Sequence, residues 1–87
     1  MMQVIVPGQL HDYTGGVSRL SAEGESVGAV LDDLDRRYPG LRFRVVDEQG
    51  RIRPHVRFYL NRSPATALGQ PVAPEDELLI VGALSGG

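Results

Sequence analysis

One amphipathic helix constrains the fold of this 87-residue chain more than any other pattern in its sequence. Apolar side chains between residues 27 and 38 recur at the 3.6-residue period of a helix that buries one face. Ser26 can accept a hydrogen bond from a free amide of the first turn, and Pro39-Gly40 ends the pattern. The sequence therefore predicts a single helix from about Ser26 to Arg37. Its buried face would contain Val27, Val30, Leu31, Leu34 and Tyr38.

Short β-prone runs precede and follow this helix. In the clearest of them, 56–60, apolar and polar side chains alternate as in a strand with one buried face. The runs at 3–6 and 78–81 are apolar at nearly every position, so we expect them side by side at the centre of a sheet, as buried parallel strands. The other expected strand regions are 17–22, 41–46 and a short extended piece at 65–68. One main helix on a mixed sheet is an α+β roll of the β-grasp (ubiquitin-like) type.

The composition excludes several classes of function. A net charge of −2, with no lysine, argues against a nucleic-acid-binding protein, which usually presents a basic face. The absence of cysteine excludes disulfides, thiolate metal sites and a cysteine nucleophile. The start resembles no signal peptide, and no apolar run approaches the ~18 residues of a membrane span, so we expect a cytoplasmic protein without a membrane partner.

The polar side chains form no convincing catalytic or metal-binding pattern. His11 and His55 are far apart in the sequence and have no cysteine nearby, so we expect no metal site. The acidic cluster Asp32, Asp33 and Asp35 is typical of a solvated helix face rather than of paired catalytic carboxylates. Any chemistry is therefore expected at the C-terminal end and would be performed by a partner protein.

The sequence ends in Leu84-Ser85-Gly86-Gly87, shortly after the apolar run 78–81. The last residues of most domains are frayed, so a terminal Gly-Gly alone says little about function. Glycine has no Cβ and reaches backbone conformations closed to other residues, so such an end can pass through a narrow channel. We expect a folded domain at 1–82 and a flexible tail at 83–87 that carries its carboxylate to another protein.

A set of short motifs follows the same order as in a known family. The set comprises Thr14-Gly15-Gly16, the segment Gly24–Leu34, Tyr38-Pro39-Gly40-Leu41, Asp47-Glu48, Gly50, Arg53-Pro54-His55, Asn61, Glu75-Asp76-Glu77, Ala83 and Gly86-Gly87. With these motifs the chain resembles the ubiquitin-like sulfur carriers of the MoaD/ThiS family over nearly its whole length. It departs from many of them at its end, where Leu84-Ser85 precedes the Gly-Gly pair instead of Val-Ala.

The resemblance implies a carrier rather than an enzyme. A ubiquitin-activating-like enzyme would adenylate the carboxylate of Gly87, and a persulfide or sulfide donor would replace AMP to give a thiocarboxylate. Gly86, Ser85 and Leu84 would pass into that enzyme, which would also supply the ATP and magnesium, so no cofactor is expected on the chain itself. The sulfur would then go to an acceptor enzyme that makes molybdopterin, cysteine, a thiazole or a secondary metabolite. The chain could also act as the small subunit of a molybdopterin-synthase-like complex.

Two other functions remain open from the sequence. In the first, the chain is a covalent protein modifier, with Gly87 joined in an amide to a lysine of a target. In the second, it is a non-covalent binding module whose tail is incidental. A mass spectrum would separate the three, because they predict a thiocarboxylate, a conjugate and an unmodified carboxylate, respectively.

The surface that binds the partner is expected on the outward side of the sheet near the tail. Phe43, Tyr59 and Leu84 are its apolar candidates and Arg57 its polar anchor, because aromatic and arginine side chains are favoured at the centres of interfaces. Phe43 fits a buried core position equally well.

Overall fold

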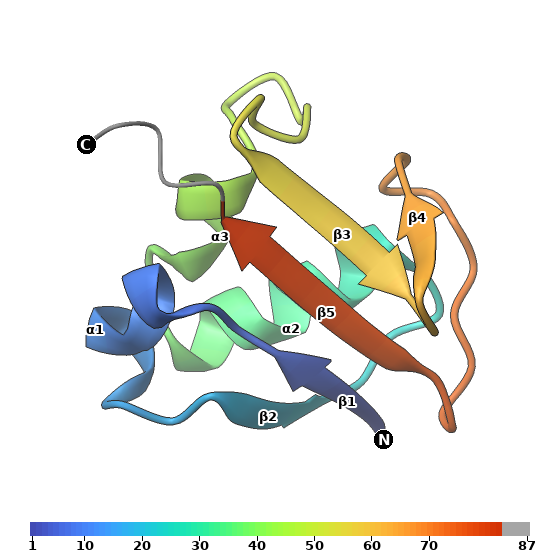
Figure 1. Cartoon of the computed structure of the whole chain (residues 1–87), viewed down its shortest axis with the longest axis horizontal. Coiled ribbons are helices and arrows are strands. Elements are labelled where there is room, and N and C mark those ends of the chain that lie inside the picture. The colour runs from blue at the N-terminus through green and yellow to red at the C-terminus, as the bar shows by residue number, and fades with distance from the viewer. Residues whose placement is uncertain (83–87) are drawn as a thin grey trace.

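The computed structural model describes residues 1–82, which form one mixed sheet with a long helix across one face (Figure 1). Residues 83–87 lie outside the described part. Within it, the five strands run in the order β2-β1-β5-β3-β4. The elements are β1 (Met2–Ile5), η1 (Gly8–Leu10), α1 (His11–Thr14), β2 (Arg19–Ala22), α2 (Val27–Arg37), α3 (Leu41–Val45), β3 (Val56–Leu60), β4 (Ser63–Ala65) and β5 (Glu77–Gly82).

The first and last strands lie side by side at the centre of this sheet, as predicted. β1 and β5 run parallel, with residues 3–5 aligned on residues 77–79. β5 pairs on its other side with β3, and β1 with β2, both antiparallel. β5 is therefore flanked by β1 at residues 77–79 and by β3 at residues 78–82, so its C-terminal end at Gly82 pairs with β3 alone.

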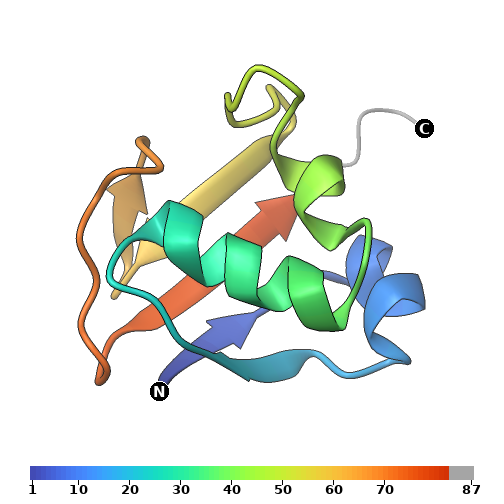
Figure 2. The ribbon, with the colours of Figure 1, turned by 180° about the vertical axis from the view of Figure 1, so that it is seen from behind.

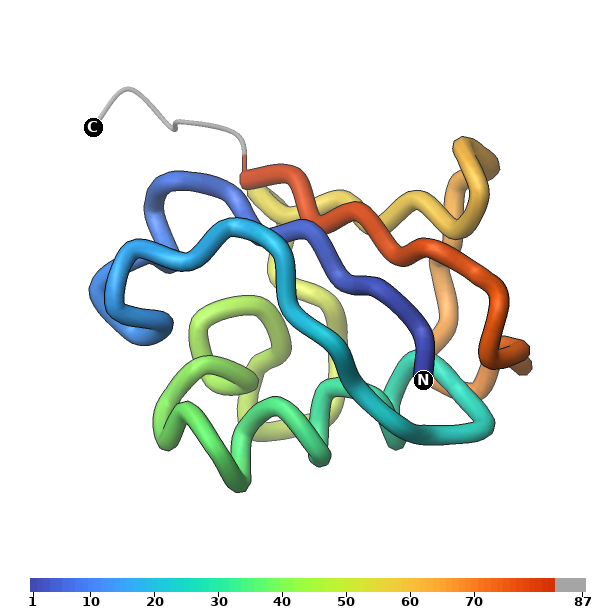
Figure 3. The backbone as a smooth tube through the Cα atoms, turned by 90° about the horizontal axis from the view of Figure 1, so that it is seen from below, coloured from blue at the N-terminus to red at the C-terminus, as the bar shows by residue number. Residues whose placement is uncertain are grey.

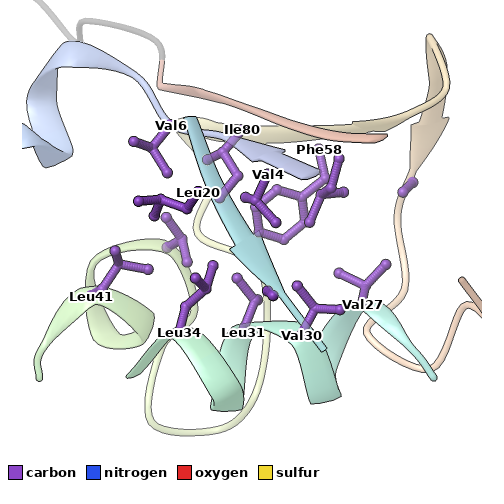
Figure 4. Close-up of a cluster of buried hydrophobic side chains, with 14 of the residues drawn as sticks. Val4, Val6, Leu20, Val27, Val30, Leu31, Leu34, Leu41, Phe58 and Ile80 are labelled. Carbon is purple, nitrogen blue, oxygen red and sulfur yellow. The ribbon is translucent and has the colours of Figure 1, made fainter. Parts of the chain in front are cut away.

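Helix α2 covers one face of the sheet and confirms the predicted helix. The Oγ of Ser26 accepts a hydrogen bond from the amide of Ala29 at 3.1 Å, which caps the first turn. Figure 2, from behind, shows the helix crossing the strands, and Figure 3 shows that helix and sheet form two layers. In Figure 4 the side chains of α2 meet those of the sheet. The buried residues labelled there are Val4, Val6, Leu20, Val27, Val30, Leu31, Leu34, Leu41, Phe58 and Ile80.

The expectation of a strand at 41–46 is wrong, because residues Leu41–Val45 form the short helix α3. A strand would point Leu41, Phe43 and Val45 to one side, whereas the helix buries Leu41 and Val45 one turn apart and leaves Phe43 exposed. The Oδ1 of Asp35 accepts hydrogen bonds from the amides of Gly40 and Arg42, both at 3.1 Å, and so supports the start of this helix. Burial and capping outweigh the β propensity of the segment.

The strand expected at 65–68 begins earlier, because the turn that precedes it is shorter than the sequence indicated. β4 is Ser63–Ala65, and Leu60 pairs directly with Ser63. The two residues between them, Asn61 and Arg62, have φ angles of 50° and 75°, as a tight two-residue hairpin loop requires. Asn61 also joins this turn to the start of β5, since its Oδ1 accepts a hydrogen bond from the amide of Glu77 at 2.9 Å.

The predicted second strand also starts later, because helical turns occupy part of the segment between β1 and β2. β2 begins at Arg19 rather than at residue 17. The short helix α1 ends at Gly15, which adopts a left-handed conformation with a φ angle of 68°. The Gly-Gly pair thus ends a helix before the chain returns to the sheet as β2, antiparallel to β1.

Asp33 ties the exposed side of α2 to the end of β2. Its carboxylate accepts hydrogen bonds from the amide of Glu23 at 3.1 Å, from Arg36 at 2.6 Å and from Arg37 at 2.9 Å. Arg37 in turn donates to the carbonyl of Ser21 in β2 at 2.6 Å. The amide of Glu23, then Arg36 and Arg37, lower the pKa of this carboxyl below its ordinary value of 3.8.

Truncating the centre of the helix–sheet contact should be costly. Leu31 is fully buried, so Leu31→Ala should lower the free energy of unfolding by about 2–5 kcal/mol through lost burial and a residual cavity. Arg36→Ala on the exposed side of the same helix is the control and should change it by less than about 1 kcal/mol, because surface ion pairs contribute little. Urea titrations of both variants measure this, and equal losses would contradict the burial of Leu31 between helix and sheet.

Acid should weaken the fold partly through Asp33. Because the folded-state pKa of this carboxyl lies below its unfolded value, its contribution to stability is present above about pH 4 and is lost as the pH falls further. The Asp33→Asn variant lacks this titration. Urea titrations between about pH 2 and pH 7 should therefore show a shallower acid loss of stability than in the wild type. Identical slopes would mean that Asp33 titrates alike in both states.

Candidate functional site

The attachment point of the C-terminal tail is the end of the central strand β5. Gly82, the last described residue, pairs with Val56 at the start of β3. The candidate residues Leu84, Ser85, Gly86 and Gly87 lie outside the described residues, so their roles and the boundary between domain and tail stay predictions. The described geometry does establish that the tail starts from a strand in the middle of the sheet rather than from its edge.

An apolar row crosses the outer face of the sheet, which is the face opposite α2. Cross-strand pairing aligns Ile5 with Leu79, Leu79 with Tyr59, and Tyr59 with Pro64. The first three are half-buried and Pro64 is exposed. Val81, two residues beyond Leu79 toward the tail, is 38% exposed. Within residues 1–82 no helix covers this face (Figure 3), so it is an apolar surface that leads to the start of the tail.

The structure places the predicted anchors Tyr59 and Arg57 on this outer face. Both alternate in β3 with the buried residues on the α2 side. One guanidinium nitrogen of Arg57, Nη1, donates to the carbonyls of Pro54 at 2.8 Å and Val56 at 3.0 Å, which holds the side chain back toward the start of β3. Beside these residues lies an open hollow of ≈ 240 Å³, lined among others by Pro54, Arg57, Tyr59 and Pro64. A partner side chain can enter it.

Phe43 does not belong to the outer face, and the interpretation of Phe43 as a core residue is also wrong. It lies on α3 and is 55% exposed. The guanidinium of Arg53 lies over its ring, with Cζ 4.5 Å from the ring centre, and the Nε of Arg53 donates to the Phe43 carbonyl at 2.7 Å. The predicted partner-binding residues are therefore divided between two surfaces.

Positive charge gathers at the end of the molecule where β5 finishes. Figures 1 and 2 place α3 at the same end as the C-terminal end of β5. Arg44, Arg53 and Arg57 at this end have no carboxylate at ion-pair distance among residues 1–82, unlike five of the other arginines. A protein with a net charge of −2 thus presents a locally basic end near the last residue of β5.

The remaining candidate residues do not assemble a catalytic centre. His11 lies in α1, with its Nε2 buried and unbonded, and His55 lies exposed just before β3. No group of three or more His, Cys, Asp or Glu side chains suited to a metal ion occurs in residues 1–82. Asp33 and Asp35 hold α2 and α3 in place. In the same part of the chain, every helix is too short or too polar to span a bilayer.

Sequence reasoning missed the outward residues of β1 and β5. The apolar runs around Val4 and Leu78 suggested strands buried on both faces, but one main helix covers only one face. If only one face of the sheet is covered, period-two alternation within β5 identifies Leu79 and Val81 as outward-facing. Gln9 was also missed: its Nε2 donates to the carbonyl of Gly82 at 3.0 Å. No local pattern marks a contact between residues so distant in the sequence.

Comparison with known proteins relates nearly the whole chain to a known family. Residues 4–87 match the model of the ThiS family. Sulfur carrier protein CysO from Mycobacterium tuberculosis is 33% identical over 89 residues, which cover 97% of this chain and 96% of that protein. Its crystal structure has a TM-score of 0.90 at 30% identity, over 97% of this chain and 100% of that one.

Two further relatives extend this likeness. The crystal structure of the BexX/CysO complex from Amycolatopsis orientalis contains a chain with a TM-score of 0.91 at 29% identity, covering 100% of both chains. Small archaeal modifier protein 1 from Haloferax volcanii is 36% identical over 70 residues, 79% of each chain. Its crystal structure has a TM-score of 0.77 at 32% identity, over 99% of this chain and 98% of that one. The chain has the ubiquitin-like β-grasp fold of these proteins and belongs to the ThiS family.

Proposed function

We propose that this chain is a sulfur carrier protein whose C-terminal Gly87 is converted to a thiocarboxylate. The observation that carries the proposal is its likeness, over almost the full length of both chains, to a protein named as a sulfur carrier. The family match extends through Gly87, so it includes the Gly-Gly end that the chemistry requires. The tail follows the central strand, where a rigid body can present it.

The chemistry requires activation because a carboxylate is a poor electrophile. In the proposed reaction a ubiquitin-activating-like enzyme joins the Gly87 carboxylate to the α-phosphate of ATP, and pyrophosphate leaves. Sulfide then attacks the acyl carbon, and AMP leaves to give the thiocarboxylate; with a persulfide donor, a further thiol must cleave the sulfur–sulfur bond. ATP and magnesium belong to the activating enzyme. The chain has no cysteine, so its only reactive sulfur would be the one loaded at Gly87.

The described domain supplies the docking surface in this proposal. The outer-face row of Ile5, Leu79, Tyr59 and Pro64 gives apolar contact area beside the start of the tail. The basic end formed by Arg44, Arg53 and Arg57 favours an acidic surface on the partner and faster association at low salt. The chain thus acts as a protein substrate, not as an enzyme, and a cytoplasmic location stays a prediction from the sequence.

The acceptor of the sulfur stays open. The chain could serve a cysteine, thiazole or secondary-metabolite pathway, and the small-subunit role in a molybdopterin-synthase-like complex is the least supported, because the relatives above carry other names. In Amycolatopsis orientalis the similar chain assembles with BexX in a BexX/CysO complex, and we expect an acceptor enzyme as a partner of this chain.

A second candidate function is covalent protein modification. The likeness to small archaeal modifier protein 1 over 70 residues favours it. The chain itself has no lysine, so it cannot form chains linked through its own side-chain amines. Mass spectrometry of the protein coexpressed with an activating enzyme distinguishes the two functions: a carrier shows one oxygen replaced by sulfur, and a modifier appears in conjugates with other proteins.

Removing the last residue should abolish activation. The variant lacking Gly87, and a variant extended by one residue beyond it, should lose pyrophosphate exchange with the activating enzyme, because the reacting carboxylate is displaced. Their free energies of unfolding should match that of the wild type, since few contacts are lost at a chain end. Exchange at the wild-type rate by the truncated chain would refute the carrier function.

Charge on the outer face should weaken docking. Tyr59→Asp and Val81→Asp should each raise the dissociation constant for the activating enzyme by about tenfold or more, because a charge would be buried in an apolar contact. Val17→Asp, at an exposed apolar residue before β2, is the matched comparison and should change it by less than about threefold. Calorimetry on variants with unimpaired unfolding transitions measures this. A loss of the same size in Val17→Asp would show that added charge weakens docking wherever it lies, and would contradict docking on the outer face.

A further inference from the structure

A side chain from the other end of the chain holds the point at which the tail begins. β1 pairs with β5 only as far as Leu79, so residues 80–82 continue beyond their neighbour on that side. After Ile5 the backbone turns away at Pro7 into η1, the turn Gly8–Leu10. The side chain of Gln9 then returns to β5, where its Nε2 donates to the Gly82 carbonyl at 3.0 Å. Gln9 thus donates a hydrogen bond to β5 in the stretch that does not pair with β1.

The glycine at position 82 fits this contact closely. A Cβ built there would lie 3.3 Å from Nε2 of Gln9, which is tighter than an ordinary contact, and 3.4 Å from its Cδ, which is at the limit of one. Gly82 does not adopt the left-handed conformation that favours glycine at five other positions, so its backbone angles do not require glycine. Close approach of the Gln9 amide to the backbone gives the physical reason for a glycine here.

We propose that Gln9 is a positioning residue that fixes the direction in which the tail leaves the domain. This inference rests on the proposed function, because it concerns delivery of Gly87 to the activating enzyme. A glycine at the start of the tail has wide conformational freedom, and each residue that is ordered on binding costs conformational entropy. The hydrogen bond from Gln9 removes part of that freedom before the partner binds, which is preorganisation.

The expected effect of Gln9 on the kinetic constants follows from its separation from the reacting carboxylate of Gly87. Gln9 contacts Gly82, which lies five residues before Gly87, so it is far from the reacting carboxylate. Its loss should therefore affect binding of the tail and not the adenylation step. Binding energy present equally in the ground and transition states changes KM and leaves kcat unchanged. A single hydrogen bond of ordinary strength corresponds to a change of about 2- to 12-fold.

The test compares four variants as substrates of the activating enzyme in pyrophosphate exchange. Gln9→Ala deletes the donor, Gln9→Glu keeps the shape but replaces the donor by a carboxylate, and Gly82→Ala disturbs the amide by the added Cβ. Each should raise KM for the carrier about 2- to 12-fold, with kcat within about twofold of the wild type. Gln49→Ala, which removes an exposed glutamine hydrogen bond in the turn before Arg51, is the control and should leave KM unchanged.

The double variant Gln9→Ala/Gly82→Ala separates positioning from direct contact with the enzyme. If both residues act through their mutual contact, its KM should match that of either single variant. Multiplied effects would show that Gln9 touches the enzyme independently and would overturn the positioning role. NMR relaxation should report increased fast motion of the Gly82 amide in Gln9→Ala, a change that loss of global stability alone does not produce.

The remaining outcomes decide between this inference and the proposed function. If the wild type supports exchange but Gln9→Ala has an unchanged KM, the inference fails and the carrier function stands. If kcat falls while KM is unchanged, Gln9 affects the chemical step and the inference also fails. If the wild type supports no exchange with an enzyme that is active on another carrier, both are overturned.

Discussion

The parallel pairing of β1 with β5 is the contact on which the rest of the structure depends. It joins the first and last strands of the described chain, so everything between them must fold back as flanking hairpin strands or as a covering helix. The inward side chains of these strands, such as Val4 and Ile80, form with α2 the core seen in Figure 4. Because β5 is central and pairs with β3 as far as Gly82, the starting point of the tail is fixed relative to the outer face.

The two faces of this sheet have different roles because only one main helix is available to cover them. Helix α2 covers the inner face, and the apolar residues of that face form the hydrophobic core with the helix. The outer face keeps the half-buried residues Ile5, Leu79 and Tyr59 without a covering helix in the described chain. An apolar row near the start of the tail suits the proposed role as a protein substrate, because a partner would have to hold the body and receive the tail together.

Local patterns predicted the fold where one physical signal dominated. The apolar period and the Ser26 cap specified α2, and strict alternation specified β3. Prediction failed at 41–46, where β-prone residues form α3, since burial of Leu41 and Val45 against the rest of the core is a tertiary effect. The same error misplaced Phe43. The arrangement of the outer face was only half predicted: Tyr59 and Arg57 were found from alternation, but Leu79 and Val81 were hidden in a run that looked buried throughout.

The sequence by itself determined the class of the fold, the main helix, the central position of the first and last strands, and the Gly-Gly end that motivates the proposed chemistry. These features depend on local periodicity, caps and composition, which can be recognised within short segments of the sequence. The tertiary structure alone decided which apolar residues remain uncovered, that Phe43 and Tyr59 lie on separate surfaces, and that Gln9 contacts Gly82. Each of these depends on how segments distant in the sequence pack together, and no local propensity encodes that information.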